Sequence, residues 1–302
     1  MHKIPQFLFE KLKNQYGEEL AEKIENGYSE KRYTSLRANT IKTTNQNIAK
    51  ELQIAGIEFD KVNWSEDAFI IKNATESDIR NTSIYTNGEI YMQSLSSMIP
   101  AIVVNPQKNE NILDMTAAPG GKTTQIAALS GNQSFITACE KNKIRLDRLK
   151  YNLEKQGVMT ANVMNVDARK LDNFFSFDKV LLDAPCSGSG TLNSNDEKLE
   201  KYFTKELIQR SVKTQSELLQ KAITVLKPGN EMVYSTCSIL QEENEDNIQK
   251  YVKTGLIEIV PINLKQYEEI PKLPTKIEGT MCIRPNELYE GFFVAKLRKK
   301  VY

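Results

Sequence analysis

Two cysteines stand in similar surroundings in this 302-residue chain. Cys186 lies in DAPCSGSG (183–190) and Cys237 in YSTCS (234–238), so each follows an apolar stretch of strand type and precedes a serine. A lone cysteine in a strand is usually a small core residue, and Cys139 and Cys282 keep that interpretation. A thiolate that adds to carbon 6 of a pyrimidine makes carbon 5 reactive toward a methyl donor. The pair therefore favours covalent chemistry on such a base.

A segment rich in small residues, DMTAAPGGKT (114–123), precedes a predicted helix. Such a segment lets the backbone approach a ligand, and the free N–H groups of a helix N-terminus suit an anion. The phosphate-loop pattern requires glycine where this chain has Thr116, which excludes the P-loop nucleoside triphosphatases. A ligand loop and a plain strand-to-helix turn both remain open. As a ligand loop the segment would present Thr116, Ala117, Ala118, Pro119, Gly120, Gly121 and Lys122.

Acidic residues end three of the predicted strands. Glu140 stands 20 residues after Gly120, where an acidic side chain can accept both hydroxyls of a ribose. Asp167 can accept a hydrogen bond from an adenine amino group, and Lys122 can bind a carboxylate. Together these side chains outline an adenosine with an amino-acid tail. Asp183 can bind the ring nitrogen of a cytosine if the two share a proton, which requires partial desolvation.

Histidine chemistry is excluded by composition. The only histidine is His2, so Ser-His, Cys-His and histidine–metal sites are not expected. No C-x-x-C pair occurs, and we expect no metal and reduced thiols, as in the cytosol. The Cys237 thiol must then be activated by its surroundings. The N-terminus of a helix near Gln241 and the cation of Lys122 are the candidates.

The elements that position these groups alternate from residue 111 onward. The pattern predicts strands at 111–115, 134–140, 161–167, 178–185 and 231–237, with helices near 121–129, 141–156, 204–226 and 241–253. This order predicts an α/β fold with a doubly wound, mostly parallel sheet, in which ligands bind beyond the carboxyl ends of the strands. A last strand at 291–297 would pair antiparallel at an edge.

The first 92 residues predict a smaller unit. A helix over 7–26, an extended segment at 35–42, a helix at 45–56 and strands within 62–72 indicate a small α/β domain, which leaves 93–302 as the main domain. The net charge is only +1, so any affinity for RNA must come from local patches. Neither a membrane-length apolar run nor an export signal is visible, which favours a cytoplasmic protein with no membrane partner.

Six ordered blocks, spread over nearly the whole chain, resemble the Nop/Sun family of RNA cytosine-C5 methyltransferases. They are SLRANTIK (35–42), YMQSLSSM (91–98), DMTAAPGGKT (114–123), DAPCSGSGTL (183–192), YSTCSILQEENE (234–245) and RPNELYEGFFVAKLRK (284–299). The resemblance implies a Rossmann-like class I methyltransferase domain that uses S-adenosyl-L-methionine, preceded by a small RNA-binding module. The chain departs from the family pattern at Ser94 and Asn286, where aspartate and histidine are frequent.

The resemblance also implies a division of labour between the thiols. Cys237 would form the covalent adduct, Cys186 would assist release of the methylated product, and residues 116–122, Glu140, Asp167 and Asp183 would surround the cofactor. No protein partner and no metal are implied. The chain ends directly after the last block, so we expect it to lack the added C-terminal RNA-binding domains of some relatives.

Alternatives remain for the target and for the role. Ribosomal RNA stands ahead of transfer RNA as the expected substrate, because the N-terminal block looks most like bacterial enzymes acting on small-subunit ribosomal RNA. A non-catalytic RNA-binding scaffold of the same fold would not need both cysteines. An enzyme that methylates heteroatoms of proteins or small molecules would not need a thiol adduct. Arg37 either contacts a phosphate of the RNA or braces the two domains.

Overall fold

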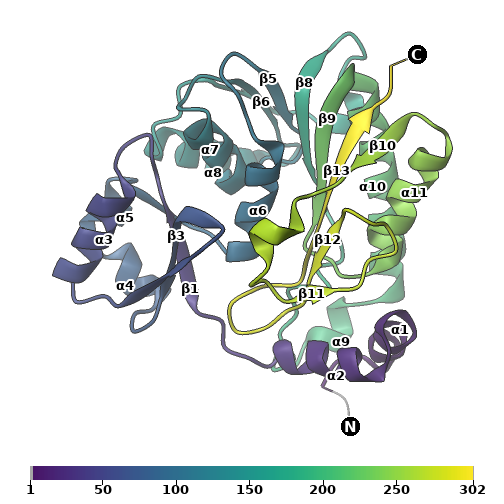
Figure 1. Cartoon of the computed structure of the whole chain (residues 1–302), viewed down its shortest axis with the longest axis horizontal. Coiled ribbons are helices and arrows are strands. Elements are labelled where there is room, and N and C mark those ends of the chain that lie inside the picture. The colour runs from purple at the N-terminus through teal and green to yellow at the C-terminus, as the bar shows by residue number, and fades with distance from the viewer. Residues whose placement is uncertain (1–2, 302) are drawn as a thin grey trace.

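The computed structural model describes residues 3–301, so His2 lies outside the described residues. Strands in the described part form two sheets, and the smaller lies on the left in Figure 1. It consists of β1 (Thr34–Ala38), β2 (Phe59–Val62), β3 (Ser65–Ile71) and β4 (Ile90–Met92). These strands pair antiparallel in the order β2-β3-β1-β4.

Both faces of the smaller sheet are covered. Side chains alternate along a strand, so Leu36 and Ala38 of β1 point to one face and Arg37 to the other. The first two join a hydrophobic core with α3 (Asn45–Ile54), α4 (Glu76–Arg80) and α5 (Ser83–Thr86). On the opposite face, Ala68 and Ile70 of β3 pack with residues of the larger sheet and its helices. Arg37 therefore faces the main domain.

The larger sheet carries the predicted strands. Its parallel part consists of β5 (Asn111–Asp114), β6 (Phe135–Cys139), β7 (Ala161–Met164), β8 (Phe177–Asp183) and β9 (Leu226–Thr236). The order of these strands is β9-β8-β5-β6-β7, so the direction of winding reverses between β5 and β8. The predicted doubly wound α/β fold is confirmed. Ligands of such sheets bind beyond the carboxyl ends at this reversal, which is where the loops after β5, β8 and β9 begin.

The prediction that the last strand lies at an edge is wrong. β13 (Phe292–Lys299) does pair antiparallel with β9, as expected, but other strands pair along its outer side. They are β10 (Ile257–Val260), β11 (Lys272–Leu273) and β12 (Met281–Ile283), in the order β11-β12-β13 with β10 also on β13. Phe292, Phe293, Val294 and Ala295 are consequently all buried. An apolar run without alternation is typical of such an interior strand.

Helices cover both faces of the larger sheet (Figure 1). On the side toward the small domain lie α6 (Leu95–Val104), α7 (Gly121–Leu129) and α8 (Lys143–Lys155), and the other side carries α9 (Leu199–Tyr202), α10 (Lys205–Val225) and α11 (Glu245–Lys253). Short 3-10 turns occur at Ala168–Lys170, Gln241–Glu243 and Leu264–Tyr267. The predicted helix over 241–253 is thus wrong at its start, because the backbone turns at Asn244 (φ −115°, ψ −97°) before α11 begins.

The predicted single helix over 7–26 is two helices. α1 (Gln6–Tyr16) and α2 (Glu18–Gly27) meet at Gly17, whose φ of 85° is a left-handed conformation that glycine adopts without strain. Leu8, Leu12 and Ile24 are buried in the core that α10 and the larger sheet form, so these helices lie against the main domain. The predicted boundary at residues 92 and 93 stays a prediction. Within residues 3–301, no helix has both the length and the apolar character to cross a membrane.

Candidate active site

Two adjoining cavities open at the carboxyl ends of β5, β8 and β9. Cavity A, of about 350 Å³, is lined mainly by the loop after β5, β4 and the start of β13. Cavity B, of about 230 Å³, extends toward the ends of β6 and β7. The residues that line both cavities are Thr116, Ala118, Asp183 and Cys237. All four were predicted as site residues from the sequence, and the fold brings them together.

The two predicted thiols are in contact at the junction of these cavities. The Sγ atoms of Cys186 and Cys237 lie 3.1 Å apart, and both residues line cavity B. The hydrogen bond with Cys237, followed by burial, raises the pKa of the Cys186 thiol well above its usual range. The two thiols thus share one hydrogen bond, in which either sulfur can be the donor.

A close backbone contact fixes the two thiol loops relative to each other. The amide of Gly190 donates to the carbonyl of Cys237 at 2.9 Å, and the amide of Gly291 donates to the carbonyl of Gly190 at 2.8 Å. A Cβ atom at position 190 would meet the carbonyl oxygen of Gly291 at 1.9 Å. Glycine is therefore required for the loops after β8 and β9 to meet the start of β13.

Asp183 and Lys122 form an ion pair beside the thiols. The ammonium of Lys122 lies 2.8 Å from Oδ2 of Asp183 and donates to Oγ of Ser97 at 2.7 Å. The other carboxylate oxygen of Asp183 accepts a hydrogen bond from Ser235 at 2.8 Å. Lys122 was predicted either to bind a ligand carboxylate or to activate Cys237. In the structure its ammonium is paired with the carboxylate of Asp183. Ser97 was not predicted, although it lies in the YMQSLSSM block.

The predicted ligand loop is tied to the strand ends around it. Asp114 accepts hydrogen bonds from the hydroxyl of Thr123 at 2.7 Å and from the amide of Thr116 at 3.4 Å. Burial raises the pKa of Asp114 to about 6. The hydroxyl of Thr116 in turn donates to the carbonyl of Asp183 at 2.7 Å. These bonds hold the loop after β5 against the end of β8.

Of the remaining residues predicted for the ligand loop, three line cavity A and one forms the backbone turn before α7. Ala117, Pro119 and Gly121 line cavity A. Gly120 has a φ of 109° and lies behind the loop, where an added Cβ would approach Leu149 of α8 to 3.1 Å. Gly120 thus serves the turn itself, and its position relative to a ligand stays a prediction.

The two predicted acidic residues of the nucleoside site both line cavity B. Glu140 follows β6 directly, is 5% exposed and accepts a hydrogen bond from the amide of Asn142 at 2.7 Å. Asp167 is bound by the guanidinium of Arg169 at 2.6 Å, which lowers the pKa of Asp167 below its usual value. Each carboxylate keeps lone pairs for a further donor. Among residues 3–301, no group of three or more metal-ligating side chains is arranged to hold a metal ion.

Arg37 braces the two domains. Its guanidinium donates to Gln93 at 2.9 Å, to the carbonyl of Gly121 at 3.0 Å and to the hydroxyl of Thr124 at 2.6 Å. With 2% exposure it does not reach solvent, where a phosphate would bind. Of the two interpretations drawn from the sequence, the structure favours the brace, and it links β1 directly to the ligand loop.

Glu243 is a buried carboxylate that connects the two thiol loops and was not singled out from the sequence. Its oxygens accept hydrogen bonds from the amide and the hydroxyl of Ser187, at 2.7 and 2.6 Å, and from the hydroxyl of Ser238 at 2.6 Å. Gln215 of α10 donates a further bond at 3.2 Å. Ser187 and Ser238 each follow one of the cysteines. Glu243 therefore fixes the spacing of the two thiols.

Replacing Glu243 with alanine is expected to lower the free energy of unfolding by about 2–4 kcal/mol, because buried donors lose their acceptor. Any activity that needs both thiols should fall at least about tenfold, since their spacing is lost. Glu243→Gln should lose less, because its amide nitrogen can donate to the serine hydroxyls. The control is Glu242→Ala, which removes a surface ion pair with Lys11 that is worth at most about 1 kcal/mol. Thermal melts and activity assays that do not separate Glu243→Ala from this control would contradict the positioning role.

Comparison with known proteins identifies the family. Residues 101–298 match the family described as 16S rRNA methyltransferase RsmB/F. The chain belongs to this family. Residues 4–78 match the ferredoxin-like domain described for the same RsmF/B-like methyltransferases. Both the Nop/Sun resemblance drawn from the six sequence blocks and the predicted small N-terminal α/β domain are confirmed.

Among similar curated proteins of the RsmB/F family are two named ribosomal RNA small subunit methyltransferase F. The one from Shewanella piezotolerans is 36% identical over 274 residues, and the one from Vibrio campbellii is 37% identical over 273 residues. Each match covers 88% of this chain but only 57% and 56% of the relatives, so the chain spans little more than half of their length.

Solved structures agree with the fold. A methyltransferase homolog protein from Pyrococcus horikoshii is 30% identical, with a TM-score of 0.82 over 99% of this chain and 100% of that one. NSun6 from the same organism has a TM-score of 0.87 at 24% identity over the whole of both chains, which supports the fold alone. The Rossmann-like arrangement of this RsmB/F family member is thus shared with methyltransferase structures.

Proposed function

We propose that this chain transfers a methyl group from S-adenosyl-L-methionine to carbon 5 of a cytosine in RNA, through a covalent bond between Cys237 and carbon 6. The observation that carries the proposal is the position of Cys237 and Asp183 on the walls of both cavities. A methyl donor in one cavity and a base in the other would meet at these side chains. The contact between Cys237 and Cys186 supplies the second thiol.

The residues of cavity B fit an adenosine. Met115, Val166 and Leu218 offer apolar surface for a planar ring, and Glu140 and Asp167 offer carboxylate acceptors. We assign the ribose hydroxyls to Glu140 and the adenine amino group to Asp167. The loop of residues 116–122, in which Thr116 and Ala118 line both cavities, would hold the methionine end where the cavities meet. When bound, S-adenosyl-L-methionine supplies the electrophilic methyl group.

Cavity A is the site proposed for the cytosine. The Sγ of Cys237 adds to carbon 6 while the Asp183 carboxylate takes the thiol proton and passes it to nitrogen 3, which raises the electron density at carbon 5. Lys122 holds the Asp183 carboxylate in place and compensates its charge. Asp183 is thus a proposed catalytic residue, and Lys122 supports it.

Cys186 is proposed to complete the reaction. Its hydrogen bond with Cys237 is the largest cause of its raised pKa, and that bond is broken once the Sγ of Cys237 carries the base. Cys186 can then lose its proton and take the hydrogen from carbon 5, after which the bond from Cys237 to carbon 6 breaks. Nitrogen 3 returns its proton through Asp183 to the departing Cys237 thiolate, and the base leaves as 5-methylcytosine.

The relatives' names favour ribosomal RNA over transfer RNA as the substrate of this chain. The test is to incubate the chain with S-adenosyl-L-methionine labelled in the methyl group and with total cellular RNA, to separate the RNA classes, and to digest each to nucleosides. Label in 5-methylcytidine from ribosomal RNA is the expected result. Label in transfer RNA alone would make transfer RNA the substrate in place of ribosomal RNA. No label in any RNA, despite binding of the cofactor, would favour a non-catalytic scaffold.

A further inference from the structure

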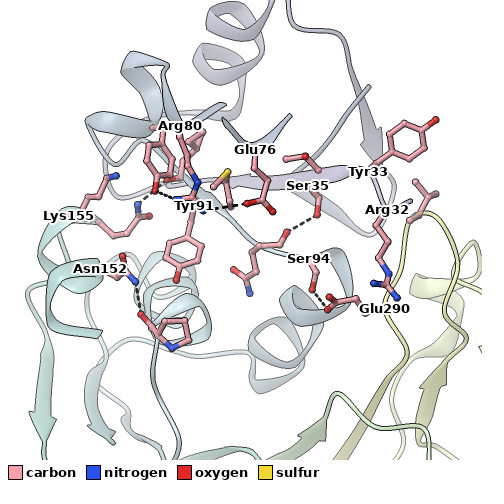
Figure 2. Close-up of a pocket in the computed structure, with 18 residues that line it drawn as sticks. Arg32, Tyr33, Ser35, Glu76, Arg80, Tyr91, Ser94, Asn152, Lys155 and Glu290 are labelled. Atoms are coloured by element: carbon pink, nitrogen blue, oxygen red, sulfur yellow. Dashed lines mark hydrogen bonds and ion pairs between the residues drawn. The ribbon is translucent and has the colours of Figure 1, made fainter. Parts of the chain in front are cut away.

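A cleft of about 550 Å³ lies between the small domain and the main domain (Figure 2). It is continuous with cavity A, because six residues line both: Tyr91, Met92, Gln93, Ser94, Pro119 and Glu290. One wall is formed by β1, α4 and β4, and the other by the end of α8 and the loop that precedes β13. We call this space the domain cleft. A polymer whose base enters cavity A has a path out along it.

Cations from both domains gather at one end of the domain cleft (Figure 2). Arg80 of α4 donates to the hydroxyl of Tyr85 at 2.7 Å, and the ammonium of Lys155 in α8 lies 3.6 Å from the centre of the same ring. Burial, followed by repulsion from Arg80 and Lys42, lowers the pKa of Lys155. Glu76 offers partial compensation, with 3.4 Å between its Oε2 and Nη2 of Arg80. This end of the cleft is electropositive in a chain whose net charge is only +1.

Two further side chains of the domain cleft, Arg32 and Tyr91, could contact a bound strand. The Nε and Nη2 atoms of Arg32 are buried without a hydrogen-bond partner. Figure 2 shows Arg32 across the cleft from Arg80 and Tyr91, with Glu76 and Ser35 between the two sides. The ring of Tyr91 lies 5.2 Å from the guanidinium carbon of Arg37 and lines both the cleft and cavity A. Tyr91 lies on the same side of the cleft as Arg80 and Lys155, and an aromatic ring beside cations suits a strand that stacks one base and presents the adjoining phosphate.

We propose that the domain cleft binds the nucleotides that flank the target cytosine, with Arg80 and Lys155 contacting one backbone phosphate and Tyr91 stacking on a neighbouring base. This inference rests on the proposed function, because it takes the cytosine in cavity A as its starting point. It also explains how a nearly neutral chain binds RNA, since phosphate contacts position a strand while the base pocket selects the target.

The test compares the salt dependence of RNA binding between two double variants. The probe is a fluorescein-labelled single-stranded oligoribonucleotide of ten adenosines and uridines around one cytosine, with binding followed by fluorescence anisotropy from about 50 to 200 mM salt. Arg80→Gln with Lys155→Gln removes both cations of the cleft. Arg210→Gln with Lys253→Gln removes the same charges from exposed positions on α10 and α11. Thermal melts confirm that each protein is folded.

Loss of two phosphate contacts should reduce the slope of log K against log salt by about 1.4, or about 0.7 for each contact on a single strand. The control variant should keep the wild-type slope. Tyr91→Ala should weaken binding without changing the slope, and Tyr91→Phe should restore it. If the two double variants have equal slopes while the wild type transfers methyl groups, the proposed binding of flanking nucleotides in the domain cleft is overturned and the proposed function stands. Absence of both binding and transfer in the wild type would overturn the proposed function as well.

Discussion

Replacing Cys237 with alanine is expected to lower the rate of methyl transfer by roughly 10³-fold or more, while the chain still binds S-adenosyl-L-methionine. No other thiol is expected to take over the attack, because Cys186 lines cavity B but not cavity A, where the cytosine is proposed to bind, and Cys139 and Cys282 are buried. The rate is measured as labelled methyl groups transferred to RNA, and binding of the cofactor by calorimetry.

Cys282→Ala is the matched control for the loss of a thiol. Cys282 is 2% exposed and packs in the core with Phe293 and Leu273, away from both cavities, so its removal should leave transfer close to the wild-type rate. Transfer by Cys237→Ala at a rate comparable with that of Cys282→Ala would exclude a covalent role for Cys237. The proposed chemistry at carbon 5 would then have no nucleophile.

Replacing Cys186 with alanine is expected to trap the reaction after methyl transfer. The adduct between Cys237 and the base would form, but the hydrogen at carbon 5 would lose the thiolate that is proposed to accept it. A protein–RNA species that survives denaturing electrophoresis should therefore accumulate, and its amount should depend on S-adenosyl-L-methionine and on Cys237.

The double variant Cys186→Ala with Cys237→Ala provides the control, because it cannot form the adduct. Normal turnover by Cys186→Ala without any accumulated adduct would show that another group accepts the proton. Asp183 would then be the next residue to test, since it also lies at the junction of the cavities.

Most of the candidate site was predictable because strand ends of a parallel sheet meet at one edge. Apolar runs that end in Asp114, Glu140 and Asp183 located that edge, and the two cysteines followed strands of the same kind. The residue-level roles did not follow from position alone. Lys122 had two candidate partners in the sequence, and only the folded chain shows its ammonium on Asp183.

The elements and the residue that were not predicted from the sequence were missed for different physical reasons. α6 is buried on nearly all sides, so its sequence, LSSMIPAIVV, lacks the apolar stripe of an amphipathic helix. β10, β11 and β12 are four residues or shorter, too short to show a period, and their pairing moves β13 from the edge to the interior. Glu243 looked like one of several charges in QEENE, and its burial against the two thiol loops depends on long-range contacts.

The central claim is a bond between Cys237 and a cytosine, and trapping that bond tests it most directly. RNA containing 5-fluorocytosine cannot lose a proton from carbon 5, so the methylated adduct should persist on the wild-type protein. After digestion, mass spectrometry should find a methylated fluorocytidine on the peptide that contains Cys237. A modified peptide containing Cys186 instead, or no modified peptide although unmodified RNA is methylated, would contradict the account.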